Sequence, residues 1–127
     1  MIRISTEKAI ALHKLLTDET GGAPDVRDMG LLESALESAF QTFGGEELYP
    51  TIEEKGARLG YALISNHAFV DGNKRIGVLI MLTFLEINGV GISPAVDDVT
   101  RMGLAVASGG MDYPSLLEWI RSSKKMQ

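Results

Sequence analysis

The stretch HAFVDGNKR, residues 67–75, contains the side chains of this sequence that are best suited to chemistry. It reads as a loop followed by a helix that starts near Asn73. Lys74 and Arg75 then lie in the first turn of that helix. Because a helix N-terminus is the positive end of the helix dipole, cations are normally disfavoured there. We therefore expect an anion to bind at this helix start.

The residues at this helix start suit a nucleotide phosphate. Gly72 lets the backbone turn tightly and lets a ligand approach it closely. The N–H groups from Asn73 onward have no partners within the helix, and such groups bind phosphate well. Arg75 can grip a phosphate through two hydrogen bonds, whereas Lys74 acts as a compact charge. The predicted phosphate-binding residues are Gly72, Asn73, Lys74 and Arg75.

Two further residues indicate a transfer reaction rather than binding alone. Asp71 would repel a phosphate unless a divalent cation bridged the two, and Mg²⁺ is held by one or two carboxylates together with substrate phosphates. His67 suits removal of a proton from an attacking hydroxyl, because histidine titrates near neutral pH. Together the nine residues predict transfer of a phosphate-containing group from a nucleotide.

Each of these residues also has a simpler interpretation. Taken alone, His67 is more often a helix cap or a surface residue, and Asp71 could be an N-cap. Lys74 and Arg75 could be solvated surface charges. Phe69 is expected to be a core residue that anchors the loop under either interpretation.

The composition narrows the class of protein. The 127 residues suit one domain, residues 1–127, and the 45% share of hydrophobic residues is ordinary for a soluble globular protein. The formal net charge of −5 disfavours direct binding to DNA, which needs a basic face. Without cysteine there is no disulfide or thiolate metal site. His13, the other histidine, is expected on the surface of the first helix, and two isolated histidines do not make a zinc site.

A cytoplasmic location is expected, with no part in the membrane. The segment MIRISTEKAIALHKLL lacks the layout of a signal peptide, because charged residues interrupt its apolar ones. The most apolar run, residues 76–87, is too short to span a bilayer. The lack of cysteine fits a reducing compartment.

Helical patterns cover nearly the whole chain and predict an all-α fold. We expect a compact bundle of about six helices around a buried central helix, residues 73–88, which is apolar on nearly every side. No stretch alternates well enough to predict a sheet, and residues 44–51 read as a polar loop. The predicted helices are residues 6–20, 28–43, 51–66, 73–88, 96–107 and 113–123.

Local signals refine these helices. Thr51 and Glu54 form a capping-box pattern at the start of the third helix. Gly56 and Gly60 lie four residues apart on that helix, which predicts the close approach of another helix. Ser5 is the predicted N-cap of the first helix, whose buried stripe would be Ile10, Leu12, Leu15 and Leu16.

The motif HAFVDGNKR resembles the signature of the Fic/Doc family, and its Doc ("death on curing") branch in particular. Fic proteins carry a His-Pro-Phe-x-x-Gly-Asn-Gly-Arg-like loop before a buried helix, whereas the Doc branch carries His-x-Phe-x-Asp/Asn-x-Asn-Lys-Arg. Here Ala68 replaces the Fic proline and Lys74 replaces the second Fic glycine. The segments QTFGGEELYPT, residues 41–51, and FLEING, residues 84–89, also resemble Doc-like toxins, so the resemblance covers most of the chain.

The resemblance implies the toxin of a type II toxin–antitoxin pair. Such a toxin would use ATP and Mg²⁺ to transfer the γ-phosphate to a threonine of elongation factor Tu and so arrest translation. His67 would be the general base, Asp71 the Mg²⁺ ligand and Phe69 the loop anchor. The phosphates would contact Gly72, Asn73, Lys74 and Arg75, and a flap from about residue 43 to residue 51 would align the target.

The resemblance leaves two other activities open and implies a protein partner. The chain could transfer AMP, as Fic proteins generally do, or be a catalytically idle interaction module of the same fold. Many Fic proteins inhibit themselves through a Ser/Thr-x-x-x-Glu-Gly/Asn motif. Thr42 and Glu46 have that spacing, but Glu47 follows them in place of Gly or Asn. A separate Phd-like antitoxin, whose disordered segment folds into a groove of this domain, is therefore expected.

Overall fold

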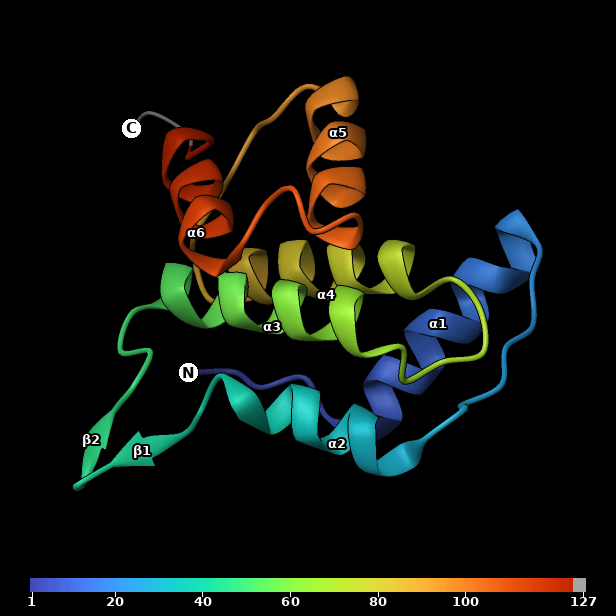
Figure 1. Ribbon diagram of the computed structural model, residues 1–127, viewed down its shortest axis with the longest axis horizontal. Helices are drawn as coiled ribbons and strands as arrows, with labels where there is room; N and C mark the ends of the chain where they lie inside the picture. Colours follow the sequence, from blue (N-terminus) through green and yellow to red (C-terminus); the bar gives the residue numbers. More distant parts are fainter. Residues whose placement is uncertain (125–127) are drawn as a thin grey trace.

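The computed structural model describes residues 1–124, which form six helices and one short hairpin (Figure 1). The predicted all-α fold is confirmed, because the hairpin strands β1 (Thr42–Phe43) and β2 (Glu46–Glu47) have two residues each. The helices are α1 (Thr6–Thr20), α2 (Met29–Ser38), α3 (Ile52–Asn66), α4 (Asn73–Ile87), α5 (Val96–Ala107) and α6 (Tyr113–Ser122).

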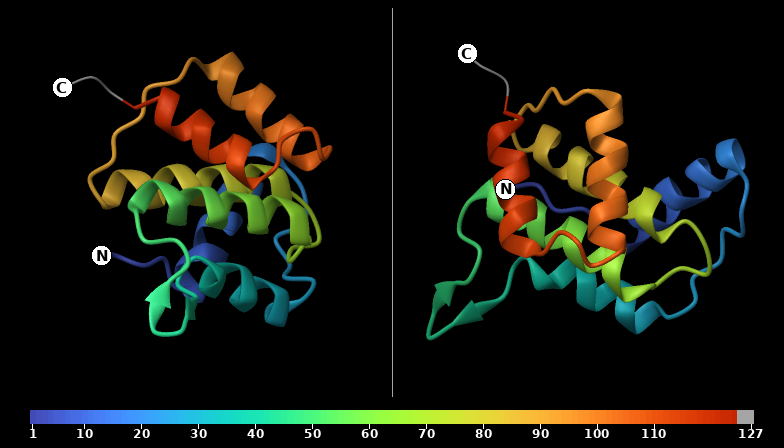
Figure 2. Two further views of the ribbon diagram at one scale, coloured as in Figure 1. Left: turned by 60° about the vertical axis from the view of Figure 1, so that its left-hand side comes forward. Right: turned by 45° about the horizontal axis from the view of Figure 1, so that its top comes forward.

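α3 and α4 lie side by side in the middle of the molecule, and the other helices cover them on two sides (Figures 1 and 2). One hydrophobic cluster joins them to α1 and α2, and a second joins them to α5 and α6. α4 serves both clusters, with Ile80 and Phe84 in the first and Met81 and Leu85 in the second. The prediction of a buried central helix is therefore confirmed, and α3 shares that position with it.

Small residues allow α3 to pack closely against α4. A Cβ atom added to Gly56 would lie 2.6 Å from Cδ2 of Leu85, and one added to Gly60 would lie 2.7 Å from Sδ of Met81. Neither distance leaves room for a side chain, so these two glycines are where α4 approaches α3. The close approach that the Gly56–Gly60 spacing predicts is confirmed.

The predicted helix caps are also confirmed. The Ser5 hydroxyl accepts a hydrogen bond from the backbone N–H of Lys8, 3.1 Å away, at the start of α1. At the start of α3 the Thr51 hydroxyl accepts from the Glu54 N–H at 3.1 Å, and the Glu54 carboxylate accepts from the Thr51 N–H at 3.3 Å. This reciprocal pair is a complete capping box.

The second predicted helix, residues 28–43, is wrong in its last third, and so is the polar loop predicted for residues 44–51. α2 ends at Ser38, and the chain then turns back on itself as a hairpin that pairs Thr42 with Glu47. Gly44 and Gly45 occupy the turn with φ angles of 60° and 83°. Two successive residues with positive φ make the turn that suits a two-residue hairpin loop, and glycine adopts it without strain.

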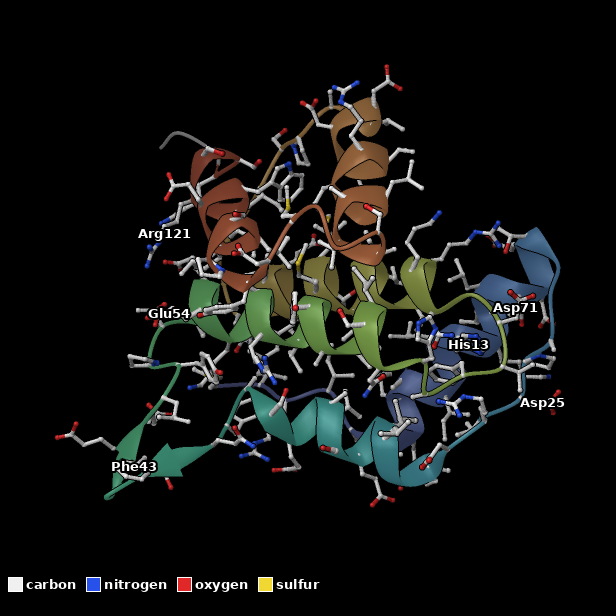
Figure 3. All side chains as sticks on the ribbon, viewed as in Figure 1. His13, Asp25, Phe43, Glu54, Asp71 and Arg121 are labelled. Atoms are coloured by element: carbon white, nitrogen blue, oxygen red, sulfur yellow. The ribbon has the colours of Figure 1, made fainter. Side chains whose placement is uncertain are left out.

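A buried lysine ties the base of this hairpin to α3. The side chain of Lys55 is 0% exposed, and its Nζ donates to Oε1 of Glu47 at 2.9 Å and to the carbonyl oxygen of Tyr49. The ammonium also lies 5.4 Å from the centre of the Phe40 ring. Phe43, in contrast, is 81% exposed near the tip of the hairpin (Figure 3). The hairpin is thus anchored at its base and free at its tip.

The buried stripe predicted for α1 is partly wrong. Leu15 is 63% exposed, and the buried positions are Ala9, His13 and Thr17, which recur every four residues. The prediction that His13 lies on the surface is therefore also wrong. The face of α1 that carries His13 packs on the loop between α3 and α4. There the imidazole lies within hydrogen-bonding distance of the carbonyl oxygen of Asp71.

No helix within residues 1–124 combines the length and the apolar character that crossing a bilayer requires.

The α3–α4 contact predicts the effect of a single methyl group at Gly77. A Cβ there would lie 2.5 Å from Cγ1 of Ile64 and 3.0 Å from its backbone nitrogen, which cannot move away. Gly77→Ala should therefore destabilise the fold by about 1–3 kcal/mol, despite the better helix propensity of alanine. Gly30→Ala, on the exposed start of α2, is the control. Its Cβ would meet only Oδ1 of the exposed Asp28, at 3.3 Å, so it should change stability much less than Gly77→Ala does. Equal denaturant midpoints for wild type and Gly77→Ala would contradict the packing described here.

Candidate active site

The loop between α3 and α4, residues 67–72, is fastened on one side by the segment that precedes α2. The Arg27 N–H donates to the carbonyl oxygen of Ala68 at 2.8 Å, and the Val70 N–H donates to that of Asp25 at 3.1 Å. These bonds pair two extended segments that are some forty residues apart in the sequence. The loop is therefore positioned by backbone pairing rather than by its own sequence alone.

His67 ends α3 in a left-handed conformation, with φ 55° and ψ 48°. Within residues 1–124 no other residue except glycine has a positive φ, so the backbone is strained at this point. Nε of Arg27 donates to the His67 carbonyl oxygen at 2.7 Å, which places a cation at the negative end of α3. The imidazole itself is exposed and lines a surface cavity.

Phe69 and Asn73 hold the middle of the loop. The Phe69 ring is 1% exposed. Its backbone N–H donates to Oδ1 of Asn73 at 3.0 Å, and Nδ2 of Asn73 donates to its carbonyl oxygen at 2.9 Å. The side-chain amide of Asn73 is thus engaged with the loop, which leaves its backbone N–H as the group that can meet a phosphate.

The start of α4 differs from that of the other five helices. Side chains cap α1, α2, α3 and α6, and α5 carries two aspartates in its first turn. α4 begins after Gly72, in the left-handed region at φ 74°, with no side-chain cap and no acidic residue in its first turn. Among the described residues nothing accepts from the N–H groups of Asn73, Lys74 and Arg75. Lys74 and Arg75 therefore add to the positive charge at this end of the helix, and no acidic side chain in the first turn neutralises it.

A polar cavity of about 540 Å³ opens at this helix start and gathers six of the seven predicted site residues. Phe69 lies behind the cavity in the core. The end of α1 forms the opposite wall, where Nη1 of Arg75 donates to the Thr20 hydroxyl at 3.2 Å. The lining residues are Thr20, Gly21, Gly22, His67, Val70, Asp71, Gly72, Asn73, Lys74 and Arg75.

Asp71 is the one carboxylate among the residues that line this cavity. Its Oδ1 accepts from the Gly72 N–H at 2.9 Å. A Cβ atom on Gly22 would lie 2.6 Å from Oδ2, so a glycine at position 22 makes the space for this carboxylate. A single carboxylate beside free N–H groups and two cations fits the way in which Mg²⁺ is held together with substrate phosphates.

Several contributors to the site were not predicted. Gly21 and Gly22 read only as the end of a helix, and nothing in the sequence indicates that Arg27 reaches α3. His13 is buried, and its Nε2 lies 2.7 Å from the carbonyl oxygen of Asp71. The four-residue spacing of Ala9, His13 and Thr17 was the available signal for His13, but a single polar residue in such a stripe is ambiguous.

A second, largely apolar hollow of about 370 Å³ lies between α4 and α5. Lys74 and Arg75 line it as well, so these two cations stand between the polar cavity and the apolar hollow. The stem of Lys74 runs past Gly103, where an added Cβ would lie 3.4 Å from Lys74 Cγ. The ammonium is therefore carried on a stem that packs against α5.

Residues 3–85 of the chain match the Fic/DOC family. A protein described as Toxin Doc, from Mycolicibacterium smegmatis, is 44% identical over 77 residues, which are 61% of this chain and 59% of that protein. Protein kinase doc of Escherichia phage P1 is 32% identical over 123 residues, which are 95% of this chain and 94% of that protein. The match with the first relative thus spans less than two thirds of its length, and the match with the second spans nearly all of it.

The family match includes α1, the loop of residues 67–72 and nearly all of α4, the elements that build the polar cavity. Its extent agrees with the resemblance carried by HAFVDGNKR and with the all-α fold. This chain therefore belongs to the Fic/Doc family.

Proposed function

We propose that this chain is the toxin of a toxin–antitoxin pair and that it transfers the γ-phosphate of ATP to a protein hydroxyl. The observation that carries the proposal is the uncapped start of α4, whose free N–H groups and two cations border one polar cavity with His67 and Asp71. Two relatives, described as a Doc toxin and as a Doc protein kinase, support it. The proposed target is a threonine of elongation factor Tu, which would place the reaction in the cytoplasm.

The phosphates of ATP would bind at the start of α4. The N–H groups of Asn73 and its neighbours would donate to phosphate oxygens, as helix N-termini do for anions. Arg75 would contribute a bidentate contact and Lys74 a point charge, which together offset the charge that builds up during transfer. Asp71 would hold Mg²⁺, which when bound neutralises charge on the phosphate oxygens.

His67 would act as the general base. No hydrogen bond engages its ring nitrogens within the described part of the chain, so the imidazole can accept the proton of the target hydroxyl. The hydroxyl oxygen then forms a bond to the γ-phosphorus, the bond from that phosphorus to the bridging oxygen breaks, and ADP leaves. The left-handed backbone of His67 would aim the ring at the substrate, and Arg27 would stabilise that conformation.

The hairpin and an antitoxin would complete the system. Residues 43–51 would form the flap that aligns the target segment, with Phe43 exposed for contact. A Phd-like antitoxin would inhibit the toxin through a disordered segment that folds on binding.

A labelled-phosphate assay tests the proposed reaction. The protein is incubated with Mg²⁺, elongation factor Tu and ATP labelled at either the α or the γ position. We expect label to reach the target from the γ position alone, and His67→Ala to lower the rate by at least about 100-fold, the usual contribution of a general base. Label from the α position would instead establish AMP transfer, and label from neither would refute this target.

Lys74 is expected to select phosphate transfer over AMP transfer. A glycine stands at this place in Fic proteins, and a lysine both fills space beside the phosphates and adds charge. Lys74→Gly should therefore raise the ratio of AMP transfer to phosphate transfer, measured with the same two labelled nucleotides. Lys74→Ala removes the same charge but keeps a good helix former, so it shows whether a change in the ratio comes from the loss of the lysine or from the weaker helix propensity of glycine. An unchanged product ratio in both variants would exclude this role.

Asn73 and Arg75 should separate structural from binding contributions. Asn73→Ala removes two hydrogen bonds to the Phe69 backbone and should destabilise the fold by about 1–3 kcal/mol, with activity falling alongside. Arg75→Gln removes an exposed cation from a helix N-terminus and also the exposed hydrogen bond to Thr20, so stability should change little. It should, however, reduce the rise in melting temperature that ATP with Mg²⁺ produces. The assigned roles would be contradicted if Arg75→Gln lowered stability while Asn73→Ala left it unchanged and reduced only the stabilisation by ATP with Mg²⁺.

A further inference from the structure

We infer that His13 is a positioning residue that fixes the peptide group between Asp71 and Gly72, and through it the direction of the Asp71 carboxylate. The inference rests on the proposed role of Asp71 as the Mg²⁺ ligand. His13 belongs to α1, is 0% exposed and is not among the residues that line the cavity.

His13 holds the loop at two points. Its ring stacks on that of Phe69, with the ring centres 3.8 Å apart and the planes 17° from parallel. Its Nε2 lies 2.7 Å from the carbonyl oxygen of Asp71. Figure 3 shows His13 on α1 and Asp71 on the loop beyond it. One side chain of α1 therefore contacts both the anchor residue of the loop and the peptide bond that leads into α4.

The hydrogen bond determines which way the Asp71–Gly72 peptide faces. The carbonyl oxygen and the N–H of a trans peptide point in opposite directions, and the peptide bonds here are trans. Because the carbonyl of Asp71 points toward His13, the N–H of Gly72 points away from it. That N–H donates to Oδ1 of Asp71 at 2.9 Å and so holds the carboxylate at the wall of the cavity.

The left-handed turn at Gly72 belongs to the same arrangement. A Cβ atom on Gly72 would lie 3.5 Å from Nε2 of His13, so the imidazole lies directly beneath this residue. Flipping the peptide would remove the acceptor from Nε2 and leave a buried donor without a partner, which is unfavourable. The histidine therefore stabilises one of the two orientations that the glycine backbone could adopt.

A purely space-filling role does not explain the choice of histidine. Nδ1 of His13 is buried and has no hydrogen-bond partner within residues 1–124, which is a penalty that an apolar side chain of similar size would avoid. Since a carbonyl oxygen can only accept, the proton must be on Nε2. The cost of leaving Nδ1 unpaired is therefore offset by the hydrogen bond from Nε2 to the carbonyl oxygen of Asp71.

Two variants separate the hydrogen bond from the ring stacking. Glutamine can place an amide donor near the position of Nε2, so His13→Gln keeps the hydrogen bond and loses the stacking. His13→Phe keeps a ring against Phe69 and loses the donor. Two quantities are compared in both variants: the exchange of the Gly72 amide proton with solvent, and the affinity for ATP measured with Mg²⁺ and with EDTA.

We expect His13→Phe to speed Gly72 amide exchange about tenfold and to lower the affinity for ATP with Mg²⁺ about tenfold, the change that one hydrogen bond supplies. Its affinity for ATP in EDTA should stay the same, and His13→Gln should resemble the wild type in all three measurements. The inference fails if the two variants behave alike, or if affinity falls equally with and without Mg²⁺.

The amide exchange keeps this test independent of the proposed function. If the wild type binds no ATP, the proposed function fails, whereas the exchange of the Gly72 proton still decides whether His13 orients the peptide. If His13→Phe does not fold, the nitrogen-15 spectrum of the wild-type histidine decides instead. A proton on Nε2 is the expected tautomer, and a proton on Nδ1 would overturn the inference.

Discussion

Close packing of α3 on α4 is the constraint on which the rest of this structure depends. Gly56 and Gly60 of α3 and Gly77 of α4 bring the two backbones together and hold the end of α3 near the start of α4. The six residues of the loop between these ends can then adopt few conformations. Hydrogen bonds from α1 and from Arg27 restrict the loop further. A packed core thereby fixes a surface site to which it contributes no chemistry of its own.

The same constraint explains how the start of α4 can remain unneutralised. Two cations in the first turn of an uncapped helix weaken that helix in isolation. Here α4 is buried against both hydrophobic clusters, and this packing offsets the unfavourable charge. The free energy of folding therefore carries the electrostatic cost of this helix start, which keeps its free N–H groups and its two cations.

Residue types and spacing identified many of the residues that line the polar cavity because these lie in one short stretch. His67, Asp71 and Arg75 lie within nine residues, and local rules for caps and glycines placed the helices that carry them. The remaining contributors come from segments far away in the chain. His13 and Gly22 become part of the site only through tertiary packing. The spacing of Ala9, His13 and Thr17 marks a buried face of α1 but does not say what that face contacts, and Gly22 reads only as the end of a helix. The hairpin was missed because a two-residue strand is too short to show an alternating pattern.

The base of the hairpin is fixed by buried contacts, whereas its tip makes few contacts with the rest of the domain. This difference determines which hairpin residues can change during evolution. Lys55 is enclosed by Glu47, Tyr49 and Phe40, so substitutions at the base would disturb α3 and, through it, the core. Gly44 and Gly45 are required by the positive φ angles of the turn, but the side chain of Phe43 beside them is 81% exposed. Exposed side chains next to the turn can therefore change with little effect on the fold or on the cavity at α4. Selection could alter what the hairpin contacts while the loop of residues 67–72 stays the same, so these two surfaces of the domain can evolve separately.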